Sequence, residues 1–599
     1  MKDFFHRLNP FRAKEASEEK TKKPPKRQET TRDTIESILF AFVLAFMFRT
    51  FEAEAFVIPT GSMAPTLYGR HKETDCTQCG YHITVGASDE VVRETGLISP
   101  HSRLQSAICP NCGFDNKQIY DELAFNGDRI LVNKYPYEFG DPDRWDVFVF
   151  KNPQEPETNY IKRLVGLPNE TLRISGGNVY KVTESGLQIL RKDPYKQRLL
   201  QIPVYDDRFP PKEILAAGWP ERWHNMKRGQ IGQFGNWSDS KSGWSPDQEQ
   251  RTYSISSDSP DLQWLRYRHF LPTDDDWYKE SKGQPLNPQA RLISDFCGYN
   301  TYTGSEFAQP YQVDTGKFWA RDLTINFDLE VEAVNDGGQI VIELCEGVSW
   351  YHCEIDLKSG RAVLSEINYQ LNERREELAE GKTAMRGPGS YSISFANVDD
   401  RLCLWINDSL VDFGESANLD SVAGATTNPL PIEQDLTPVG IAASGVTATI
   451  SDLLLQRDTY YRAEFLDHRN NRFEHRLVSL SHDPEAWADA YIEDADEMDS
   501  LEIEIGPDEY VALGDNSPRS LDSRLWGDGQ QTVPRKFLVG KAFYIYWPHG
   551  IPFMNQGRGF PVLYNKYIID QMREQKSPKD YPRYTAPFYP QFWRMHRIR

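Results

Sequence analysis

An uncharged apolar window near the N-terminus constrains where the rest of the chain can lie. Its centre, Ser37–Phe48, is twelve residues long and carries no charged side chain. Twelve residues alone are also typical of a buried helix or a signal-peptide core, because a membrane span needs about 20. Over residues 34–56 the window is long enough to span, provided that Glu36 and Arg49 reach the membrane interfaces. We expect a transmembrane helix there; no A-x-A-like site precedes a polar mature start, which disfavours a cleaved signal peptide.

Residues 1–33, ahead of this window, are rich in lysine and arginine, and we expect them to form a disordered basic arm. Positively charged flanks stay in the cytoplasm, so everything after residue 56 is expected outside the cytoplasmic membrane, which the chain crosses once. The mean hydropathy of −0.62 excludes a polytopic membrane protein. The net charge of −20 argues against a dedicated nucleic-acid-binding protein, whose surface would be basic.

A serine follows the window in the segment Phe56–Leu67, FVIPTGSMAPTL. Pro59 and Pro65 stiffen this segment, and Gly61 permits backbone angles that expose Ser62. A serine is a weak nucleophile at neutral pH and needs a general base. The segment has no G-x-S-x-G motif, and no histidine stands in a recognisable triad context. Taken alone, the pattern is also typical of an ordinary loop.

A lysine is the candidate base. Lys162 lies in Asn159–Pro168, where it alternates with apolar neighbours as a strand residue would. Burial disfavours an ammonium ion and lowers the pKa of a lysine, so that a neutral amine is available to take the proton of Ser62. The alternative is a solvated lysine on an edge strand.

The chain resembles the bacterial type I signal peptidases, which are membrane-anchored Ser/Lys endopeptidases. The resemblance rests on the apolar window followed by five blocks in the same order as in that family. A sixth segment matches the last core strand of the family. The blocks and this segment are Phe56–Leu67, Gly127–Val132, Asp146–Phe150, Tyr160–Pro168, Leu513–Gly527 and Val539–Pro548.

The resemblance implies an all-β catalytic domain that needs no cofactor for catalysis. Ser62 would be the nucleophile and Lys162 the general base. The Ser62 backbone N–H and the Thr60 hydroxyl would stabilise the oxyanion. The substrates would be the signal peptides of translocated preproteins, with small residues at positions −1 and −3, cleaved at the outer face of the membrane.

The resemblance also assigns supporting and substrate-contacting residues. Ser520 would hydrogen-bond to Lys162 and orient it, while Asp522 and Arg524 would brace the strand that carries the lysine. The substrate pocket would be lined by Phe56, Ile58, Met63, Leu67, Tyr160 and Ile161.

Two positions depart from the family pattern. The chain has Asn169-Glu170 where the family usually has Gly-Asp, and it has Trp145 before Asp146 where the family usually has glycine. Both positions are expected to lie in turns, so the departures concern local backbone geometry and leave the dyad unaffected.

Two C-x-x-C-G pairs lie in an insertion over residues 73–120, between the serine and lysine blocks. Each pair presents two thiolates around a tight glycine turn, and four thiolates complete a tetrahedral structural zinc site. Disulfides are the alternative, since this region is expected outside the cytoplasm. We expect a zinc-ribbon-like insertion whose ligands are Cys76, Cys79, Cys109 and Cys112.

A second, larger insertion separates the lysine block from the C-terminal blocks. Alternating strands predict an antiparallel β-sandwich over residues 317–456 that resembles the concanavalin/laminin-G-like jelly roll. Such domains often bind glycans or proteins, and a spacer role is an equal alternative. Residues 195–316 carry no fold assignment. Four further cysteines are candidates for disulfides in an oxidising compartment, with a Cys345–Cys353 cross-strand bridge as one alternative: Cys297, Cys345, Cys353 and Cys403.

The predicted fold is therefore mainly β, with the catalytic core in three pieces. The expected order is 1–33 arm, 34–56 transmembrane helix, 57–72 first core piece, 73–120 ribbon, 121–194 second core piece, 195–316 unassigned, 317–456 sandwich, 457–500 acidic linker, 501–550 third core piece and 551–599 aromatic and basic tail. The competing function is an anchored glycan- or protein-binding module with an inactive peptidase core.

Overall fold

The computed structural model describes residues 34–43, 53–91, 103–228, 237–240, 243–300, 316–368, 374–419, 429–463, 471–494, 499–526, 529–554, 560–561, 585–586 and 588–598. The chain divides into two units, Met1–Glu52 and Ala53–Arg599. The first unit contains a helix over 34–43 whose apolar side chains, such as Leu39 and Phe40, are exposed. Among the described residues, every helix is too short or too polar to cross a membrane. The basic arm expected over 1–33 lies outside the described residues.

The expected helix over 34–56 is wrong at its C-terminal end. Ala53–Val57 is strand β1, which pairs antiparallel with β5 (Arg129–Asn133), and Phe56 lies opposite Ile130. Phe56 is half-buried while its neighbour Val57 is exposed, so side chains alternate between two faces as they do in a strand.

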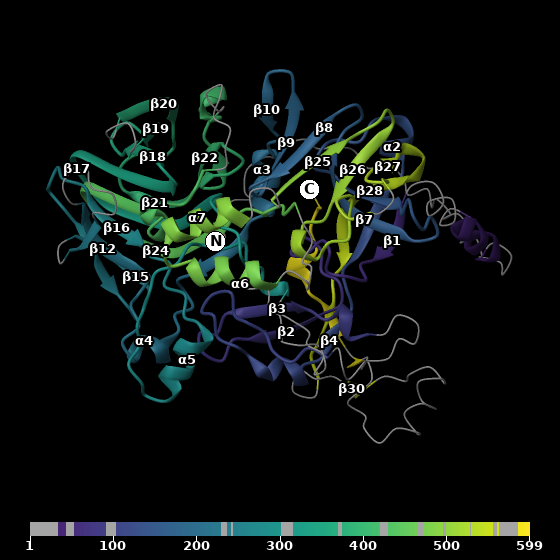
Figure 1. Ribbon diagram of the computed structural model, residues 1–599, viewed down its shortest axis with the longest axis horizontal. Helices are drawn as coiled ribbons and strands as arrows, with labels where there is room; N and C mark the ends of the chain where they lie inside the picture. Colours follow the sequence, from purple (N-terminus) through teal and green to yellow (C-terminus); the bar gives the residue numbers. More distant parts are fainter. Residues whose placement is uncertain are drawn as a thin grey trace, which may run out of the picture. The chain divides into compact units, whose positions relative to one another are not determined.

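The core that the sequence predicts to be catalytic is a seven-stranded antiparallel sheet assembled from distant parts of the chain (Figure 1). The strand order is β1-β5-β28-β6-β7-β26-β27. Both faces of β6 are buried: Val147 and Val149 face one apolar cluster, and Phe148 and Phe150 face another. This two-sided burial explains the unbroken apolar run of that strand. The remaining strands are β6 Val147–Lys151, β7 Asn159–Gly166, β26 Glu509–Leu513, β27 Val533–Pro534 and β28 Leu538–Trp547.

A four-stranded sheet of order β10-β9-β8-β25 adjoins this core. Leu172, Ile174 and Ile503 from this sheet pack in one cluster with Val165 and Leu513 from the catalytic sheet. The two sheets therefore share a core. The strands of the four-stranded sheet are β8 Thr171–Ser175, β9 Asn178–Thr183, β10 Gly186–Ile189 and β25 Ser500–Glu504.

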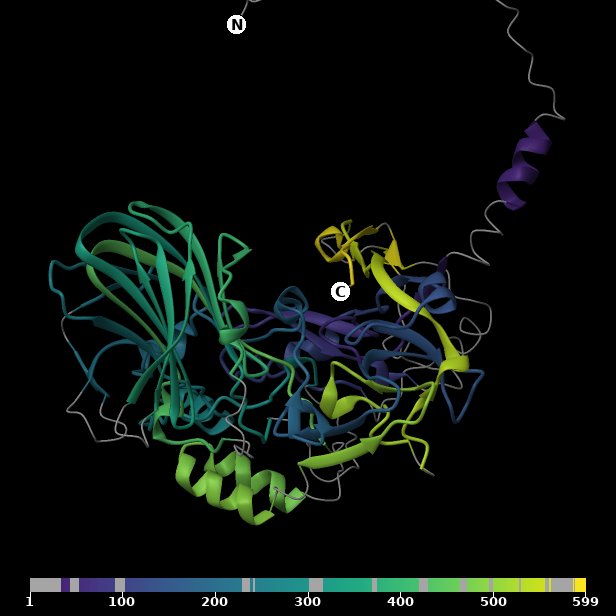
Figure 2. The same cartoon turned by 90° about the horizontal axis from the view of Figure 1, so that it is seen from above.

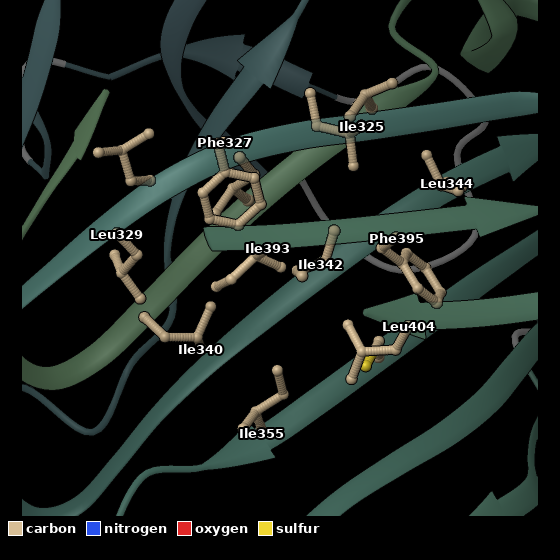
Figure 3. Packing of buried hydrophobic residues seen from close by; sticks show 14 of the residues in the cluster. Ile325, Phe327, Leu329, Ile340, Ile342, Leu344, Ile355, Ile393, Phe395 and Leu404 are labelled. Carbon is tan, nitrogen blue, oxygen red and sulfur yellow. The ribbon is translucent and has the colours of Figure 1, made fainter. Parts of the chain in front are cut away.

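The large insertion is one 14-stranded antiparallel sheet that encloses its own core. The first half of β17 pairs with β21 and the second half pairs with β18, while β24 pairs with both halves. The register shifts at the middle of β17, where Gly337 has a φ of 75° that favours glycine. Side chains from the facing strands, including Phe327, Ile342 and Phe395, meet in the interior (Figure 3).

Strands β11–β16, from the stretch without an assigned fold, belong to this same sheet. The fourteen strands are β11 Ile202–Asp206, β12 Trp223–Arg228, β13 Trp237–Asp239, β14 Ser245–Asp247, β15 Thr252–Ser256, β16 Gln263–Tyr267, β17 Leu323–Glu346, β18 Ser349–Asp356, β19 Arg361–Asn368, β20 Arg374–Lys382, β21 Gly389–Asn397, β22 Leu402–Ile406, β23 Ser409–Leu410 and β24 Val439–Arg457.

Residues 457–500 were expected to be an acidic linker, and the structure corrects this. They contain two helices, α6 (Asn471–Leu480) and α7 (Pro484–Asp494), which lie side by side (Figure 2). Trp487 and Tyr491, one helical turn apart, stack at 5.1 Å between ring centroids and are buried against residues that include Phe318. The other helices are α2 Tyr135–Phe139, α3 Pro194–Leu199, α4 Lys212–Ala216 and α5 Asp274–Ser281.

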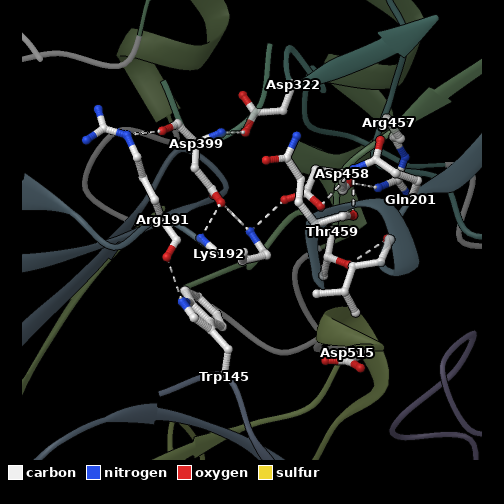
Figure 4. Close-up of polar contacts among 12 residues, drawn as sticks. Trp145, Arg191, Lys192, Gln201, Asp322, Asp399, Arg457, Asp458, Thr459 and Asp515 are labelled. Carbon is white, nitrogen blue, oxygen red and sulfur yellow. Dashed lines mark hydrogen bonds and ion pairs between the residues drawn. The ribbon is translucent and has the colours of Figure 1, made fainter. Parts of the chain in front are cut away.

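A buried ion cluster joins the core to the sandwich (Figure 4). Lys192 Nζ donates to Asp399 Oδ2 at 2.8 Å and to Asp458 Oδ2 at 2.7 Å, and these two carboxylates hold the pKa of the lysine above its usual range. Trp145 Nε1, from the turn before β6, donates to the Arg191 carbonyl at 3.0 Å. The ammonium ion therefore occupies the place between the carboxylates that a bound cation would otherwise take.

The described part of the tail folds back onto the core. Strand β29 (Gly550–Pro552) pairs with β32 (Phe588–Pro590), and β30 (Phe560–Pro561) pairs with β31 (Thr585–Ala586). Arg594 pairs with the buried Asp128 at 2.7 Å, which ties the tail to the start of β5.

All eight cysteines are free thiols in this structure. The alternative of a Cys345–Cys353 bridge is wrong, because Cys345 lies opposite Trp350 and Cys353 lies opposite Ile342 in the β17–β18 register. The two cysteines are therefore three registers apart on neighbouring strands.

Candidate active site

Ser62 lies in a tight turn that follows β1. The Ile58 N–H donates to the Asp128 carbonyl at 2.9 Å, which ends the strand pairing with β5, and the Ala64 N–H donates to the Gly61 carbonyl at 3.0 Å. The turn presses against Gly69, where an added Cβ would lie 2.2 Å from the Thr60 carbonyl carbon. Ser62 and Thr60 are both half-buried. The backbone of the candidate nucleophile is thus fixed on both sides.

Lys162 meets Ser62 from strand β7, which lies between β6 and β26. Its Nζ lies 2.8 Å from Ser62 Oγ and 3.0 Å from the carbonyl oxygen of Ile161. The side chain is buried, with 4% of its surface exposed. Burial lowers the pKa of Lys162 from 10.5 to about 8, although the negative charges of Asp522 and Asp515 oppose the shift.

Ser520 is buried beside the same turn but does not hydrogen-bond to Lys162. Its Oγ has no hydrogen-bond partner among the described residues. A Cβ added at Gly514 would lie 2.1 Å from that oxygen and 2.4 Å from the Ser62 carbonyl, so Ser520 lies close to the Ser62 backbone. The expected Ser520–Lys162 hydrogen bond is therefore not formed in this structure, where the lysine amine bonds to Ser62 and Ile161.

Asp522 and Arg524 form a buried ion pair at 2.8 Å. Asp522 accepts from the Gly514 N–H at 2.9 Å, and Arg524 donates to Ser517 Oγ at 2.8 Å and to the Arg462 carbonyl at 2.6 Å. These bonds brace the turn after β26 and the end of the large insertion. Among the described residues, the hydrogen bonds of Asp522 and Arg524 reach this turn and Arg462, not the strand β7 that the resemblance expects them to brace.

A second buried ion pair was missed by the sequence reasoning. Arg163 donates to both carboxylate oxygens of Asp515 at 2.7 Å, and neither side chain is exposed to solvent. Asp515 also accepts from Thr66 Oγ1 at 2.6 Å. This carboxylate therefore joins the lysine strand, the serine turn and the turn after β26. The positions of these two residues in the sequence could have indicated the pair. Arg163 directly follows Lys162, and Asp515 lies inside the block Leu513–Gly527 that resembles the family.

The large insertion also reaches the serine turn. The side-chain amides of Asn300 and Asn516 exchange two hydrogen bonds of 2.7 Å. Asn516 Nδ2 donates to the Gly61 carbonyl at 2.9 Å, and the Asn516 N–H donates to the Ser62 carbonyl at 3.1 Å. A Cβ added at Gly61 would lie 2.2 Å from the Tyr299 ring, so only glycine fits there. No motif in the sequence indicated these contacts.

The six expected pocket residues do not form one surface. Five of them share an apolar cluster, but Ile58, Met63 and Leu67 are buried in it, so they support the site from beneath. Phe56 and Ile161 are half-buried at its edge and remain accessible. Tyr160 is half-buried in a different cluster, with Phe150 and Trp526, and its ring centroid lies 5.4 Å from Lys162 Nζ.

Both departures from the family pattern lie where the backbone is left-handed. Trp145 has a φ of 69° and Asn169 a φ of 62°. A non-glycine residue in this conformation costs about 1–2 kcal/mol, and asparagine tolerates it better than most. The buried Trp145 indole offsets its cost by packing with Val165 and Leu172. The backbone at both positions thus keeps the left-handed conformation that glycine adopts most easily, although neither residue is glycine.

The four C-x-x-C cysteines, two near each end of the ribbon insertion, come together in space. Cys76 Sγ lies 3.6 Å from Cys112 Sγ, and Cys79 Sγ lies 3.6 Å from Cys109 Sγ. All four sulfur atoms lie within 4.8 Å of one another. Sulfur atoms bound to a tetrahedral zinc ion are about 3.8 Å apart, so the donor set and its spacing fit zinc. The adjoining three-stranded sheet consists of β2 His71–Asp75, β3 His82–Gly86 and β4 Ala124–Phe125.

Two parts of the chain match a known protein family. Residues 116–217 and 441–547 match the family described as signal peptidase, peptidase S26. Signal peptidase I of Pseudomonas aeruginosa is 51% identical over 59 residues, which are 8% of this chain and 21% of that protein. Signal peptidase I of Leptolyngbya laminosa is 27% identical over 199 residues, which are 32% of this chain and 65% of that protein. The chain thus spans less than two thirds of either relative.

Among solved structures, the chain is similar to a carbohydrate-binding module, CBM66, from Bacillus subtilis. The match covers 39% of this chain and 92% of that module, with 13% identity and a TM-score of 0.21.

The family match contains Lys162 and the turn that carries Ser520, but it does not extend to Ser62. The resemblance of this chain to the bacterial type I signal peptidases, members of the peptidase S26 family, is confirmed.

Proposed function

We propose that the chain is a serine endopeptidase of the signal peptidase I type, with Ser62 as nucleophile and Lys162 as general base. The observation that carries this proposal is the 2.8 Å distance between the buried amine of Lys162 and the hydroxyl of Ser62. A base must lie within hydrogen-bond reach of the proton that it removes, and its pKa must lie near the working pH. A lysine with a pKa of about 8 meets both requirements.

In the first half of the reaction, Ser62 Oγ attacks the scissile carbonyl carbon while neutral Lys162 takes the hydroxyl proton. The Ser62 N–H and the Thr60 hydroxyl donate to the oxyanion that forms. The C–N bond then breaks, and the Lys162 ammonium ion gives its proton to the leaving amine of the mature protein. The signal peptide remains on Ser62 as an ester.

In the second half, water attacks this ester and Lys162 again acts as base, which releases the signal peptide and restores Ser62. The turn that carries the serine must keep its position through both steps. We assign this positioning to Asp515, through Thr66 and Arg163, and to Asn516, through the carbonyls of Gly61 and Ser62.

The substrates in this proposal are preproteins with small residues at positions −1 and −3, cut at the outer face of the cytoplasmic membrane. The chain would be anchored through its apolar segment, with the basic arm in the cytoplasm. Phe56 and Ile161, which are half-buried beside the dyad, are the apolar side chains that we expect a substrate to contact.

The zinc proposal concerns stability alone. Cys76, Cys79, Cys109 and Cys112 would hold the ion, and four sulfur ligands leave no position for a substrate. Trp277 Nε1, from the large insertion, donates to the Cys112 carbonyl at 3.1 Å. The metal would thus fix the surface on which the large insertion packs.

A cleavage assay in detergent tests the proposed function. Wild type is expected to cut a preprotein after an A-x-A sequence, while Ser62→Ala and Lys162→Ala are expected to lose at least about 10³-fold in kcat. Ser185→Ala and Lys151→Ala, at exposed positions, serve as matched controls and should keep full activity. Full activity in either dyad variant would refute the mechanism. A wild type that cuts no preprotein would favour the binding-module alternative.

A further inference from the structure

A second cluster of metal-ligating side chains lies apart from both the dyad and the four cysteines. His71 and Glu73 occupy alternate positions of β2 and so point to the same face of that strand. His549 joins them from the segment that follows β28. One ligand atom from each of the three residues lies within 4.8 Å of the other two. The two histidines are buried, and Glu73 is half-buried.

The spacing of these atoms matches a tetrahedral metal site. His71 Nε2 lies 3.2 Å from His549 Nδ1 and 3.6 Å from Glu73 Oε1, and His549 Nε2 lies 3.4 Å from Glu73 Oε2. Nitrogen and oxygen ligands that lie about 2.0–2.2 Å from a zinc ion are about 3.3–3.6 Å apart in tetrahedral geometry. The distances from His71 Nε2 to His549 Nδ1 and to Glu73 Oε1 are therefore close to those that an ion would impose, while the 3.4 Å distance joins the other nitrogen of His549 to the other oxygen of Glu73.

The hydrogen bonds around His71 prepare it as a ligand. His71 Nδ1 lies 2.7 Å from the Gly69 carbonyl oxygen, which can only accept, so Nδ1 carries the proton. The lone pair of Nε2 then points into the cluster. This arrangement, with one ring nitrogen donating to a carbonyl and the other free, is typical of a histidine that binds a metal.

The hydrogen bonds of the three residues do not satisfy one another. His71 Nε2 has a single lone pair, so it can bind a metal only if the His549 Nδ1 that lies 3.2 Å away does not donate to it. In a neutral His549 the proton is then on Nε2, which lies 3.4 Å from Glu73 Oε2 and makes no hydrogen bond among the described residues. The lone pairs of His71 Nε2 and His549 Nδ1 then face each other. A cation between these two acceptors removes the conflict.

Aromatic rings pack against the two histidines. The Phe125 ring packs against His549, with 4.4 Å between ring centroids, and the Tyr68 ring lies 5.2 Å from that of His71. Among the described residues, the salt-bridge partners of Glu73 are histidines alone, including the exposed His82. Glu73 thus pairs with His82 on its exposed side and faces the two buried imidazoles on the other.

We infer that His71, Glu73 and His549 bind a divalent transition metal of the zinc class. Two imidazoles and one carboxylate suit zinc rather than calcium or magnesium, which prefer oxygen ligands. The ion would clip the end of the last core strand to the base of the ribbon, joining residues that lie 478 positions apart in the sequence. This inference does not depend on the proposed peptidase activity.

Zinc itself is the probe, measured in the purified full chain after dialysis against metal-free buffer. We expect about two zinc ions per wild-type chain, and about one in both His549→Gln and Cys79→Ser. The double variant should retain about none, and His82→Ala should match wild type. One ion per wild-type chain that is lost in Cys79→Ser and kept in His549→Gln would overturn the inference.

X-ray absorption at the zinc edge of wild type gives a test that needs no variant. Two sites together predict an average shell of about two sulfur and two nitrogen or oxygen neighbours per zinc. A shell of four sulfur neighbours alone would overturn the inference even if the variants fail to fold.

Discussion

The pKa of Lys162 makes the strongest prediction, because it ties the buried position of one side chain to the rate of cleavage. Burial lowers this pKa from 10.5 to about 8. The shift of about 2.5 pH units corresponds to about 3.4 kcal/mol of differential stabilisation of the neutral amine. At pH 7 about 9% of the lysine is neutral, compared with about 0.03% for an ordinary lysine, so the supply of active base is about 300-fold larger.

The corresponding assay is the pH dependence of kcat/KM for a preprotein substrate between pH 5.5 and 10. Below pH 8 we expect the rate to rise about tenfold per pH unit, because only the neutral amine accepts the proton of Ser62. Above pH 8 the rate should reach a plateau. A value of kcat/KM that keeps rising with a midpoint near pH 10, or one that does not change across the range, would refute the role assigned to the buried amine.

The same shift predicts how the free energy of unfolding depends on pH. Below pH 8 both states hold the proton, so the penalty for burying the ammonium ion, about 3.4 kcal/mol, is fully present. Between pH 8 and 10.5 only the unfolded chain holds the proton, and stability rises with pH. Lys162→Met should therefore stabilise the fold at pH 7 by up to about 3 kcal/mol and much less at pH 10.5, in denaturant unfolding. A loss of stability at pH 7 would contradict this, and Lys151→Met, at an exposed position, is the control.

The remaining predictions concern residues that hold the site in place. Asn300→Ala removes both hydrogen bonds to Asn516, so kcat should fall about tenfold with little change in KM. Asn418→Ala, on the sandwich surface, is the control and should leave kcat unchanged. Equal kcat values in the two variants would contradict the positioning role of Asn300. Cys79→Ser should release zinc and lower the melting temperature by several degrees, and a protein that contains no zinc would exclude the ribbon site. Lys192→Met leaves two buried carboxylates unpaired and should cost about 3–5 kcal/mol of unfolding free energy, measured with urea, whereas a neutral result would mean that the ion cluster does not join the core to the sandwich.

The short-range patterns of the sequence predicted much of the site. Alternating apolar residues around Lys162 indicated a buried strand, and β7 is that strand. The C-x-x-C spacing indicated that four cysteines meet, and their sulfur atoms do lie together. Such patterns succeed because they depend on the period of one element or on one tight turn.

The sequence did not predict the contacts between distant segments. Asn300 and Asn516 are separated by 216 positions, and neither belongs to a pattern that marks a partner. The helices α6 and α7 were read as an acidic linker because composition outweighed the spacing of Trp487 and Tyr491. Helical stability there comes from tertiary packing, which no local window contains.

These contacts also change how the role of the large insertion can be tested. Deleting residues 200–500 would remove Asn300 and Tyr299 from the serine turn and Trp277 from the cysteine cluster. A change in selectivity after such a deletion would therefore not separate substrate choice from damage to the site. Single substitutions such as Asn300→Ala make that separation.

The central claim is that Ser62 forms the covalent intermediate, and mass spectrometry of a trapped adduct tests it most directly. A peptide that ends in a diphenyl phosphonate after an A-x-A sequence is expected to react with Ser62 in wild type, with loss of phenol, and to leave its mass on the tryptic peptide that contains this residue. The adduct should be absent in Ser62→Ala and strongly slowed in Lys162→Met. An adduct on any other residue, or unchanged labelling in Ser62→Ala, would contradict the account.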